Sequence, residues 1–396
     1  MSGWKTVRLL LWLLLAWPLL AWSAEPVLRG TGALGVIVER GSGRILIVDT
    51  SSNSIINRVD GLGDLSHASV VFSRDQRYAY VFGRDGGLSK VDILRGTLDK
   101  RIVQGGNSIG GAISQNGRLV AVANYEPGGL KVFAADTLEP VADIPAAYGV
   151  EGKLSKVVGI ADLPGDRFIY SLFDADQIWI ADVRDPKAPK VEKFSNIGKS
   201  PYDGLVTPDG RYYLAGLFGE DGIALLDTWQ PQQGVRRILA GYGQGEQKLP
   251  VYKMPHLRGW AVAGRQVYLP AIGRHEVLVA DTQTWKETAK IAVRGQPVFV
   301  VARPDGRQVW VNFAFPDNGF VQVIDTLAGQ IVQTLEPGKA VLHLEFTPRG
   351  EAVWISARDD NKIVVYDTAS FAKLAELPAE SPSGIFLTAR AHRIGF

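Results

Sequence analysis

Residues 303–326 read RPDGRQVWVNFAFPDNGFVQVIDT and contain both features that recur along this chain. They begin with a Pro-Asp-Gly-Arg turn, continue through alternating β-branched and aromatic residues, and end in Asp325-Thr326. Pro presets the backbone at the start of a turn, and Gly supplies the positive φ of a tight hairpin. The alternation between the turn and Asp325 has the period of a β-strand. The stretch therefore predicts antiparallel strands joined by tight turns.

The aspartate that ends this stretch is one of eight. An apolar run ends in Asp, often followed by Thr, at Asp49, Asp92, Asp136, Asp182, Asp227, Asp281, Asp325 and Asp367. Six of the seven spacings lie between 42 and 46 residues, and the seventh is 54 because residues 243–257 form an insertion. A turn similar to that at 304–307 precedes each Asp after the first. Fixed periods of about 40 to 50 residues with several strands each indicate a β-propeller.

The eight markers predict an all-β, eight-bladed β-propeller of four-stranded blades. Residues 25–396, divided by eight, give about 46 residues a blade, which is usual for propellers. The first unit, residues 44–50, has no preceding turn, and the last is followed by only one further strand, residues 383–388. We therefore expect the N- and C-terminal strands to share one blade, which closes the ring and protects its edges.

Residues 1–24 have the features of a cleaved signal peptide. Lys5 and Arg8 precede an almost wholly apolar run at residues 9–22. That run has 14 residues, whereas a membrane-spanning helix needs about 20. A membrane anchor is the alternative. We expect export to the periplasm, cleavage, and a soluble mature propeller at residues 25–396.

Charge and cysteine content exclude several classes of function. With 43 Lys and Arg against 41 Asp and Glu, the net charge is +2, which gives no electrostatic reason to expect nucleic acid as a partner. The absence of Cys excludes disulfides, zinc–thiolate sites, iron–sulfur clusters, a Cys nucleophile and covalently attached c-type haem. It also excludes an acylated Cys as a lipid anchor, so we expect no stable membrane anchor.

The five histidines are the most informative candidates outside the repeat. His67, His256 and His343 fall at the same phase of their blades, before the turn, which places them at one face of the ring. His275 and His392 are expected at the periphery. A single His is more often structural than a ligand. Three of the five histidines occupy equivalent positions in their blades, and this favours a binding site at the central channel.

Arginines near these histidines suggest the chemistry of a ligand. Arg84 is either a turn residue paired with Asp85 or a guanidinium that binds a carboxylate, and Arg258 follows His256 closely. Imidazoles and guanidiniums around a wide channel suit a flat, polyanionic ligand that contains a metal. A carboxylated iron tetrapyrrole fits that description.

The block from His67 to Asp92, with Arg77-Tyr78 and the VFGRDG run at 81–86, resembles the d1-haem propeller of cytochrome cd1 nitrite reductase. The predicted mature chain as a whole is similar to exported haem d1 biosynthesis propellers that lack a cytochrome c domain. The resemblance implies an eight-bladed fold and a non-covalently bound iron tetrapyrrole, either haem d1 or its precursor.

The resemblance also implies roles for individual residues. His67 corresponds to the axial ligand of the haem iron, and Arg84 corresponds to an arginine that holds the carboxylates. Further pocket positions of the family correspond to Tyr125, His256, Arg258, Phe315, His343 and Ser383.

Two departures from the reductase alter the expected function. Tyr202 stands where the reductase has a second distal His, and Val70 stands where it has an Arg. We therefore expect no nitrite reduction. The resemblance instead implies binding of a late, dihydro-haem d1-like precursor, with a dehydrogenation or side-chain modification, or transfer of the product. Four residues could move protons, and of these Tyr202, Asp203 and His256 are the catalytic candidates; the fourth is Tyr125.

Two alternatives remain open from the sequence. One is a non-enzymatic haem d1 carrier or chaperone, and the other is a protein-interaction propeller without a ligand. No motif identifies an electron acceptor for an enzyme. Nitrite reductase and other proteins of the d1 pathway are the candidate protein partners.

Overall fold

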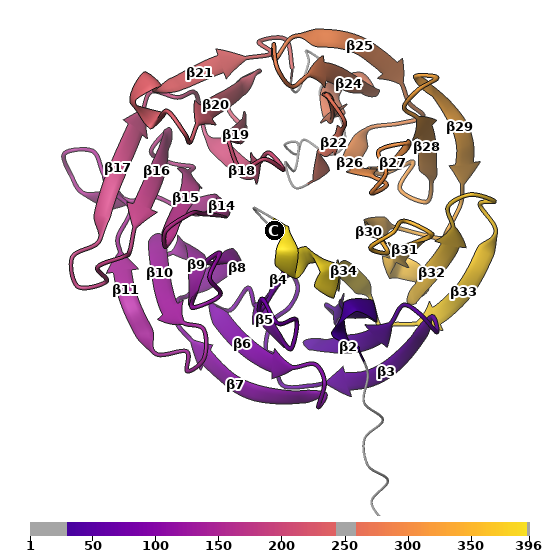
Figure 1. Ribbon diagram of the computed structural model, residues 1–396, viewed down its shortest axis with the longest axis horizontal. Coiled ribbons are helices and arrows are strands. Elements are labelled where there is room, and N and C mark those ends of the chain that lie inside the picture. The colour runs from indigo at the N-terminus through magenta and orange to yellow at the C-terminus, as the bar shows by residue number, and fades with distance from the viewer. Residues whose placement is uncertain (1–29, 243–258, 394–396) are drawn as a thin grey trace, which may run out of the picture. The chain divides into compact units, whose positions relative to one another are not determined.

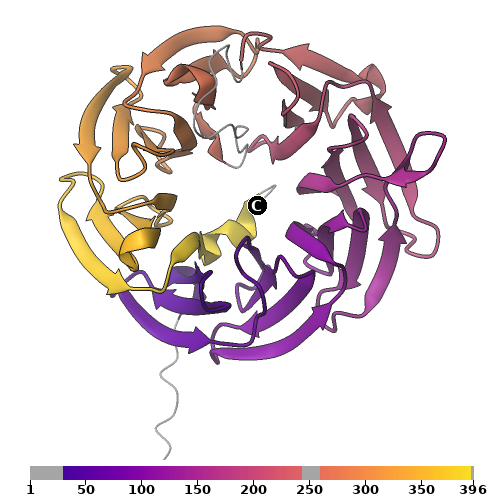
Figure 2. The same cartoon turned by 180° about the vertical axis from the view of Figure 1, so that it is seen from behind.

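The computed structural model describes residues 30–242 and 259–393, and their strands form a ring of eight antiparallel sheets (Figure 1). Each sheet has four strands, and a further two-stranded hairpin stands apart from them. Figure 2 shows the ring from its other face. The all-β, eight-bladed prediction is confirmed.

Seven blades consist of four consecutive strands, and the following ranges run from the central channel outward. The first four of these blades are β4 (Ser69–Phe72), β5 (Tyr78–Phe82), β6 (Gly87–Asp92) and β7 (Thr97–Val103); β8 (Asn107–Ile113), β9 (Leu119–Glu126), β10 (Gly129–Ala134) and β11 (Pro140–Ile144); β14 (Val157–Leu163), β15 (Arg167–Leu172), β16 (Gln177–Asp182) and β17 (Lys190–Ser195); and β18 (Pro201–Val206), β19 (Tyr212–Leu217), β20 (Ile223–Asp227) and β21 (Val235–Ile238). The other three are β22 (Ala261–Ala263), β23 (Gln266–Ala271), β24 (Glu276–Asp281) and β25 (Glu287–Ala292); β26 (Pro297–Ala302), β27 (Gln308–Phe313), β28 (Val321–Asp325) and β29 (Gln330–Leu335); and β30 (Val341–Phe346), β31 (Ala352–Ala357), β32 (Lys362–Asp367) and β33 (Lys373–Pro378). The additional hairpin pairs β12 (Ala147–Tyr148) with β13 (Lys153–Leu154).

The eighth blade joins the two ends of the propeller. Its innermost strand is the C-terminal β34 (Pro382–Leu387), followed outward by β1 (Leu34–Glu39), β2 (Arg44–Asp49) and β3 (Ser54–Val59). β34 pairs antiparallel with β1, with Val36 opposite Phe386. The prediction of a shared, ring-closing blade is therefore confirmed.

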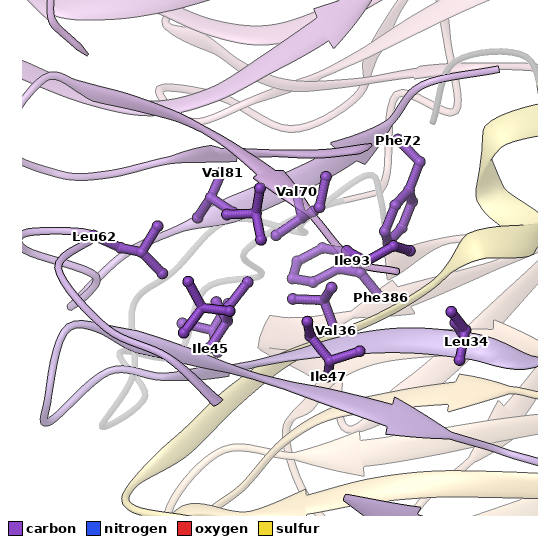
Figure 3. Close-up of a cluster of buried hydrophobic side chains, with 14 of the residues drawn as sticks. Leu34, Val36, Ile45, Ile47, Leu62, Val70, Phe72, Val81, Ile93 and Phe386 are labelled. Atoms are coloured by element: carbon purple, nitrogen blue, oxygen red, sulfur yellow. The ribbon is translucent and has the colours of Figure 1, made fainter. Parts of the chain in front are cut away.

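The core is divided into eight hydrophobic clusters, one at each contact between neighbouring blades. Figure 3 shows the cluster between the closing blade and the β4–β7 blade, where Val36 and Ile47 face Val70 and Val81. An equivalent cluster around Trp354 joins the β30–β33 blade to the closing blade. Because every blade buries both faces against its neighbours, a single blade has no complete core of its own.

The eight aspartates have a structural role that explains why they repeat. Seven are the last residue of the third strand in their blade, and Asp136 lies two residues beyond β10. Their carboxylates accept N–H bonds from the following turn, as Asp325 does from Leu327 at 2.9 Å and from Ala328 at 2.8 Å. In three blades the arginine of the preceding turn also pairs with the carboxylate, in Arg77–Asp92, Arg211–Asp227 and Arg265–Asp281. Because these contacts are local, the period is visible in the sequence.

The helices of the described residues are short 3₁₀ helices. They are η1 (Thr31–Ala33), η2 (Pro231–Gln233), η4 (Ile272–Arg274), η5 (Arg358–Asp360) and η6 (Thr388–His392). Within the ranges 30–242 and 259–393, no helix has the length and apolar character needed to cross a bilayer. The predicted signal peptide and the insertion at 243–257 lie outside the described residues.

The buried tryptophan of one blade lacks a hydrogen bond that the equivalent tryptophan of the neighbouring blade makes. Trp310 donates its indole N–H to Gln308, two residues earlier in β27, at 3.1 Å. The equivalent Trp354 in β31 has Ala352 at that position, and its buried indole N–H has no partner among the described residues. Ala352 also lines a cavity of about 590 Å³ that offers room for a longer side chain.

Ala352→Gln is therefore expected to stabilise the protein by about 1 kcal/mol, the usual net value of one hydrogen bond. Denaturant unfolding of the two proteins measures the difference. Ala352→Leu, which adds bulk without an acceptor, is the control and should not reproduce the gain. An equal gain from Leu would show that filling the cavity, rather than satisfying the indole, stabilises the fold.

Candidate functional site

The innermost strands of seven blades enclose a cavity of about 390 Å³ in the central channel. Its walls come from β4, β8, β14, β18, β26, β30 and β34 or residues next to them, and from Arg40 and Arg84 in the turns after β1 and β5. Neighbouring strands of a blade are antiparallel, so the chain crosses the ring along the first, innermost strand and returns along the second. The start of the innermost strand and the turn after the second strand therefore lie on the same face of the ring. Residues from these two positions in different blades therefore meet at one end of the channel.

Six of the residues singled out from the sequence line this cavity. They are His67, Arg84, Tyr202, Asp203, His343 and Ser383. They come from four blades, and the ring brings them together across the channel. His275 and His392 are exposed and lie outside the cavity lining.

The other predicted site residues have different positions. Tyr125, at the end of β9, does not line the cavity, but its hydroxyl donates to the Tyr202 hydroxyl at 3.3 Å. Phe315 follows β27, is 64% exposed, and is not among the lining residues. His256 and Arg258 lie outside the described residues.

The loop that carries His67 and the turn that carries Arg84 are held together by the backbone. The Arg84 N–H donates to the Asp64 carbonyl at 2.8 Å, and the Asp64 N–H donates to the Asp85 carboxylate at 3.2 Å. The Asp64 carboxylate accepts the Ser66 N–H at 2.8 Å. Hydrogen bonds from the Ser66 side chain and backbone, with smaller contributions from Arg84 and Arg40, lower the pKa of Asp64. Hydrogen bonds through Asp64 therefore join the loop of His67 to the turn of Arg84 and fix the positions of these two residues relative to each other.

Arg40 adds a second guanidinium to this corner of the cavity. Burial, followed by the positive charges of Arg358 and Arg84, lowers the pKa of Arg40. Arg40 and Arg84 occupy the turn after the second strand in two adjacent blades and both line the cavity, whereas Arg358, in the equivalent turn of the β30–β33 blade, pairs with Asp359 and is not among the lining residues. The corner therefore concentrates positive charge, which suits a ligand with carboxylates.

Sequence reasoning identified Arg84 but missed Arg40 and Arg390. The turn at Arg40 resembles an ordinary hairpin, and Arg390 lies beyond the last predicted strand, two residues before His392. The available signal for Arg40 was its turn position, which matches that of Arg84 in the next blade. No local signal marks Arg390, because the closing strand β34 brings it to the cavity.

Arg390 is held by a buried ion pair beneath the cavity. Its guanidinium donates two hydrogen bonds to the Glu345 carboxylate, at 2.8 and 2.5 Å. It also lies 5.1 Å from the centre of the Phe386 ring, a cation–π distance. In Figure 1 the yellow segment after β34 turns toward the centre of the ring. Arg390 belongs to η6, which follows β34, and lines the cavity.

His343 lies between two aromatic rings at the cavity wall. Its ring centre is 5.9 Å from that of Phe299 and 5.6 Å from that of Phe386. Its backbone N–H donates to the Ser356 hydroxyl at 2.9 Å, and its Nδ1 accepts the Ile385 N–H at 3.2 Å. Burial and the nearby Arg390 charge lower the pKa of His343 to about 4. His343 is therefore a neutral imidazole at physiological pH.

This shift predicts an acid-sensitive contribution to stability. The unfolded chain protonates His343 near pH 6.5 and the folded chain only near pH 4, so stability present above about pH 6.5 is lost as the pH falls toward 4. At pH 5 the expected loss is about 2 kcal/mol. His343→Gln removes the titrating group, so its unfolding free energy should fall less between pH 7 and pH 5 than that of the parent. His275→Gln, at an exposed position, is the control, and parallel pH profiles for parent and His343→Gln would contradict the shift.

Aromatic side chains flank the cavity on the side away from the arginines. Tyr202 lies about edge-on to Phe173, with ring centres 6.0 Å apart, and Phe218 completes the group at 6.0 Å from Tyr202. Burial, then the neighbouring Tyr202 and Asp203, raise the pKa of Tyr125. Tyr125 therefore keeps its proton and remains a donor to Tyr202 at neutral pH.

The cavity residues suit a flat, negatively charged iron tetrapyrrole. The arginine corner has the charge that carboxylates require, and His67 at the cavity is of a residue type that can coordinate iron. Gly110 leaves open space, because a Cβ there would meet only the Ser69 hydroxyl, at 3.4 Å. That hydroxyl is buried without a hydrogen-bond partner among the described residues. Within the same residues, no group of three or more His, Cys, Asp or Glu could hold a bare metal ion.

Comparisons with known proteins agree with this chemistry. The family model described as Cytochrome D1 heme domain matches residues 29–391. Protein NirF of Stutzerimonas stutzeri is 62% identical over 384 residues, which cover 97% of this chain and 98% of that protein. Protein NirF of Pseudomonas aeruginosa (strain PAO1) is 59% identical, with 94% and 95% covered.

A dehydrogenase of P. aeruginosa is a more distant relative. Dihydro-heme d1 dehydrogenase is 30% identical over 360 residues, covering 89% of this chain and 70% of that protein. The solved structure described as dihydro-heme d1 dehydrogenase NirN in complex with DHE superposes with a TM-score of 0.79 at 27% identity, over 95% of this chain and 79% of that chain. Apo AztD from Citrobacter koseri, at 14% identity and a TM-score of 0.61, shares the fold alone.

Proposed function

This chain belongs to the Cytochrome D1 heme domain family, and we propose that it binds a late haem d1 precursor in its central cavity during the biosynthesis of that cofactor. The observation that carries the proposal is the cavity itself, in which His67 lies beside a corner formed by Arg40 and Arg84. The NirF proteins that match along nearly the whole chain support it. The complexed NirN structure supports a tetrapyrrole as the ligand class.

Different residues of the cavity would bind different parts of this ligand. His67 would supply the axial nitrogen, and Arg84 with Arg40 would bind the carboxylates without any covalent bond. Ser383 and the open position at Gly110 would lie against the macrocycle. When bound, the iron tetrapyrrole supplies a coordination site and a visible absorption spectrum that reports on its ligands.

Chemical modification of the bound precursor is the finer part of the proposal. Tyr202 and Asp203 line the cavity, and Tyr125 donates to the Tyr202 hydroxyl, so these groups could move protons at the ligand. His256, the third catalytic candidate, lies outside the described residues. The dehydrogenase relative makes dehydrogenation one reaction to test, with an external electron acceptor. The alternative is a carrier that transfers the tetrapyrrole to nitrite reductase or another protein of the pathway.

Mixing the mature chain with dihydro-haem d1 without oxygen tests the function. Binding should shift the absorption spectrum and saturate at one ligand per chain. Conversion of the bound ligand after addition of an electron acceptor, faster than that of free ligand, would support modification. Unchanged ligand that transfers to haem-free nitrite reductase would support a carrier. No spectral change would contradict the proposal and favour an interaction propeller.

Export to the periplasm is also part of the proposal, and it rests on the N-terminal sequence. We expect cleavage after Ser23 or Ala24. N-terminal sequencing of the protein from a periplasmic extract checks this. An intact N-terminus recovered only with membranes would show that the segment is an anchor.

A further inference from the structure

His343 faces the cavity with one ring nitrogen and the protein with the other. Nδ1 accepts the Ile385 N–H at 3.2 Å, so that nitrogen carries a lone pair and not a proton. In a neutral imidazole the proton is then on Nε2. Nε2 makes no hydrogen bond within the described residues and is not among their fully buried polar atoms, and His343 lines the cavity. The donor therefore points to the space that a ligand would occupy.

Several contacts keep this imidazole from accepting a second proton. A proton on Nδ1 would break the hydrogen bond to Ile385 and leave that N–H unpaired. Phe299 and Phe386 pack against the ring and offer no charge. Of the charged groups near it, Arg390 disfavours a cation, and the Glu345 carboxylate is engaged by Arg390 through two hydrogen bonds.

We propose that His343 is a neutral Nε2–H donor that binds an acceptor oxygen at the edge of the cavity ligand, a carbonyl or a carboxylate. In this role it is a positioning residue, and it acts neither as an iron ligand nor as a general base. The assignment of the proton to Nε2 of His343 depends only on contacts within the protein. The ligand contact rests on the proposed function.

The tautomer is tested on the ligand-free protein. The chain has five histidines, so ¹⁵N-histidine labelling gives a small set of long-range ¹H–¹⁵N signals, and the signal lost in His343→Gln assigns His343. We expect the pattern of a neutral Nε2–H imidazole throughout pH 5.5 to 8. A Nδ1–H pattern, or a cation above pH 6, would overturn the proposal.

The ligand contact is tested with haem d1 as the probe. Gln carries one acceptor for Ile385 and one donor for the ligand, whereas Phe keeps the packing and removes both. Binding by His343→Phe should weaken by roughly five- to tenfold, the usual effect of one lost hydrogen bond, and His343→Gln should stay near the parent. Any pH dependence of the parent affinity between pH 6 and 8 should be the same in His343→Gln, because only the proposed axial ligand His67 has to be deprotonated to bind iron.

The outcomes separate this inference from the proposed function. Equal binding by the parent and His343→Phe would overturn the contact. A parent affinity that titrates between pH 6 and 8, with no such dependence in His343→Gln, would show that His343 ionises. If even the parent fails to bind haem d1, the proposed function fails, while the NMR experiment still decides the tautomer. Thermal unfolding of each variant verifies that it is folded.

Discussion

Replacing His67 with Ala is expected to change the absorption spectrum of the bound iron tetrapyrrole while some binding remains. The substitution removes one coordinate bond, whereas the arginine corner and the walls of the cavity are unaltered. Affinity should fall by at least about tenfold, because even the loss of a residue that only supports a metal ligand commonly costs roughly 10- to 100-fold. Titration of haem d1 into both proteins, followed by absorption, measures both effects.

Arg84→Ala is expected to give the opposite pattern. Its loss should weaken binding by roughly 10- to 100-fold, because charge-assisted hydrogen bonds contribute about 1.5 to 3 kcal/mol. The remaining affinity should depend less on salt, since one charge pair is gone, and the iron spectrum should stay similar. Arg40 would retain part of the binding, so the double variant should be weaker than either single one.

Controls for this pair come from residues outside the cavity. His275→Ala removes an exposed imidazole, and Arg349→Ala removes an arginine that is 87% exposed in a turn before β31. Neither should alter the spectrum or the affinity. If His67→Ala leaves the spectrum unchanged while His256→Ala abolishes it, the proximal and distal faces are the reverse of those proposed. If neither alters it, the iron is not held by these histidines.

Gly110→Trp is expected to abolish tetrapyrrole binding without unfolding the protein. Gly110 lies in β8 at the cavity wall, its φ is outside the left-handed region, and a Cβ would meet only Ser69. An indole there would occupy the volume proposed for the macrocycle. Absorption titration measures the loss, and circular dichroism with thermal unfolding verifies the fold.

Neighbouring substitutions sharpen this test. Gly110→Ala should keep both binding and stability, since one methyl group fits beside Ser69. At the adjacent Gly111 a Cβ would clash with the Phe82 ring, so Gly111→Ala should destabilise the protein by about 1 to 3 kcal/mol. Full binding by folded Gly110→Trp would show that the ligand does not use this cavity.

The position of each blade was predictable because its markers have local functions. An aspartate that ends a third strand accepts hydrogen bonds from the next two or three residues, and in several blades it pairs with an arginine of the preceding hairpin turn. These requirements repeat with every blade. The closing blade was predictable for a related reason, because the first and last units were each incomplete.

The candidate site was predictable only in part. His67 and His343, two of the three histidines with equivalent positions in their blades, both line the cavity, and the third, His256, lies outside the described residues. The separation of Tyr125 from the cavity by Tyr202, and the exposure of Phe315, depend on how side chains pack between blades. The repeat pattern in the sequence does not reveal how side chains of neighbouring blades pack against one another.

The amino-acid sequence by itself determined the all-β class, the eight blades, the shared closing blade and the end of the channel at which His67 and Arg84 lie. It did so because strand period, turn chemistry and the aspartate markers are local properties. Only the tertiary structure decided which residues meet across the channel. Arg390 joins the cavity because β34 pairs with β1, and Arg40 joins Arg84 because adjacent blades place equivalent turns together. These contacts span long sequence separations and arise from closure of the ring.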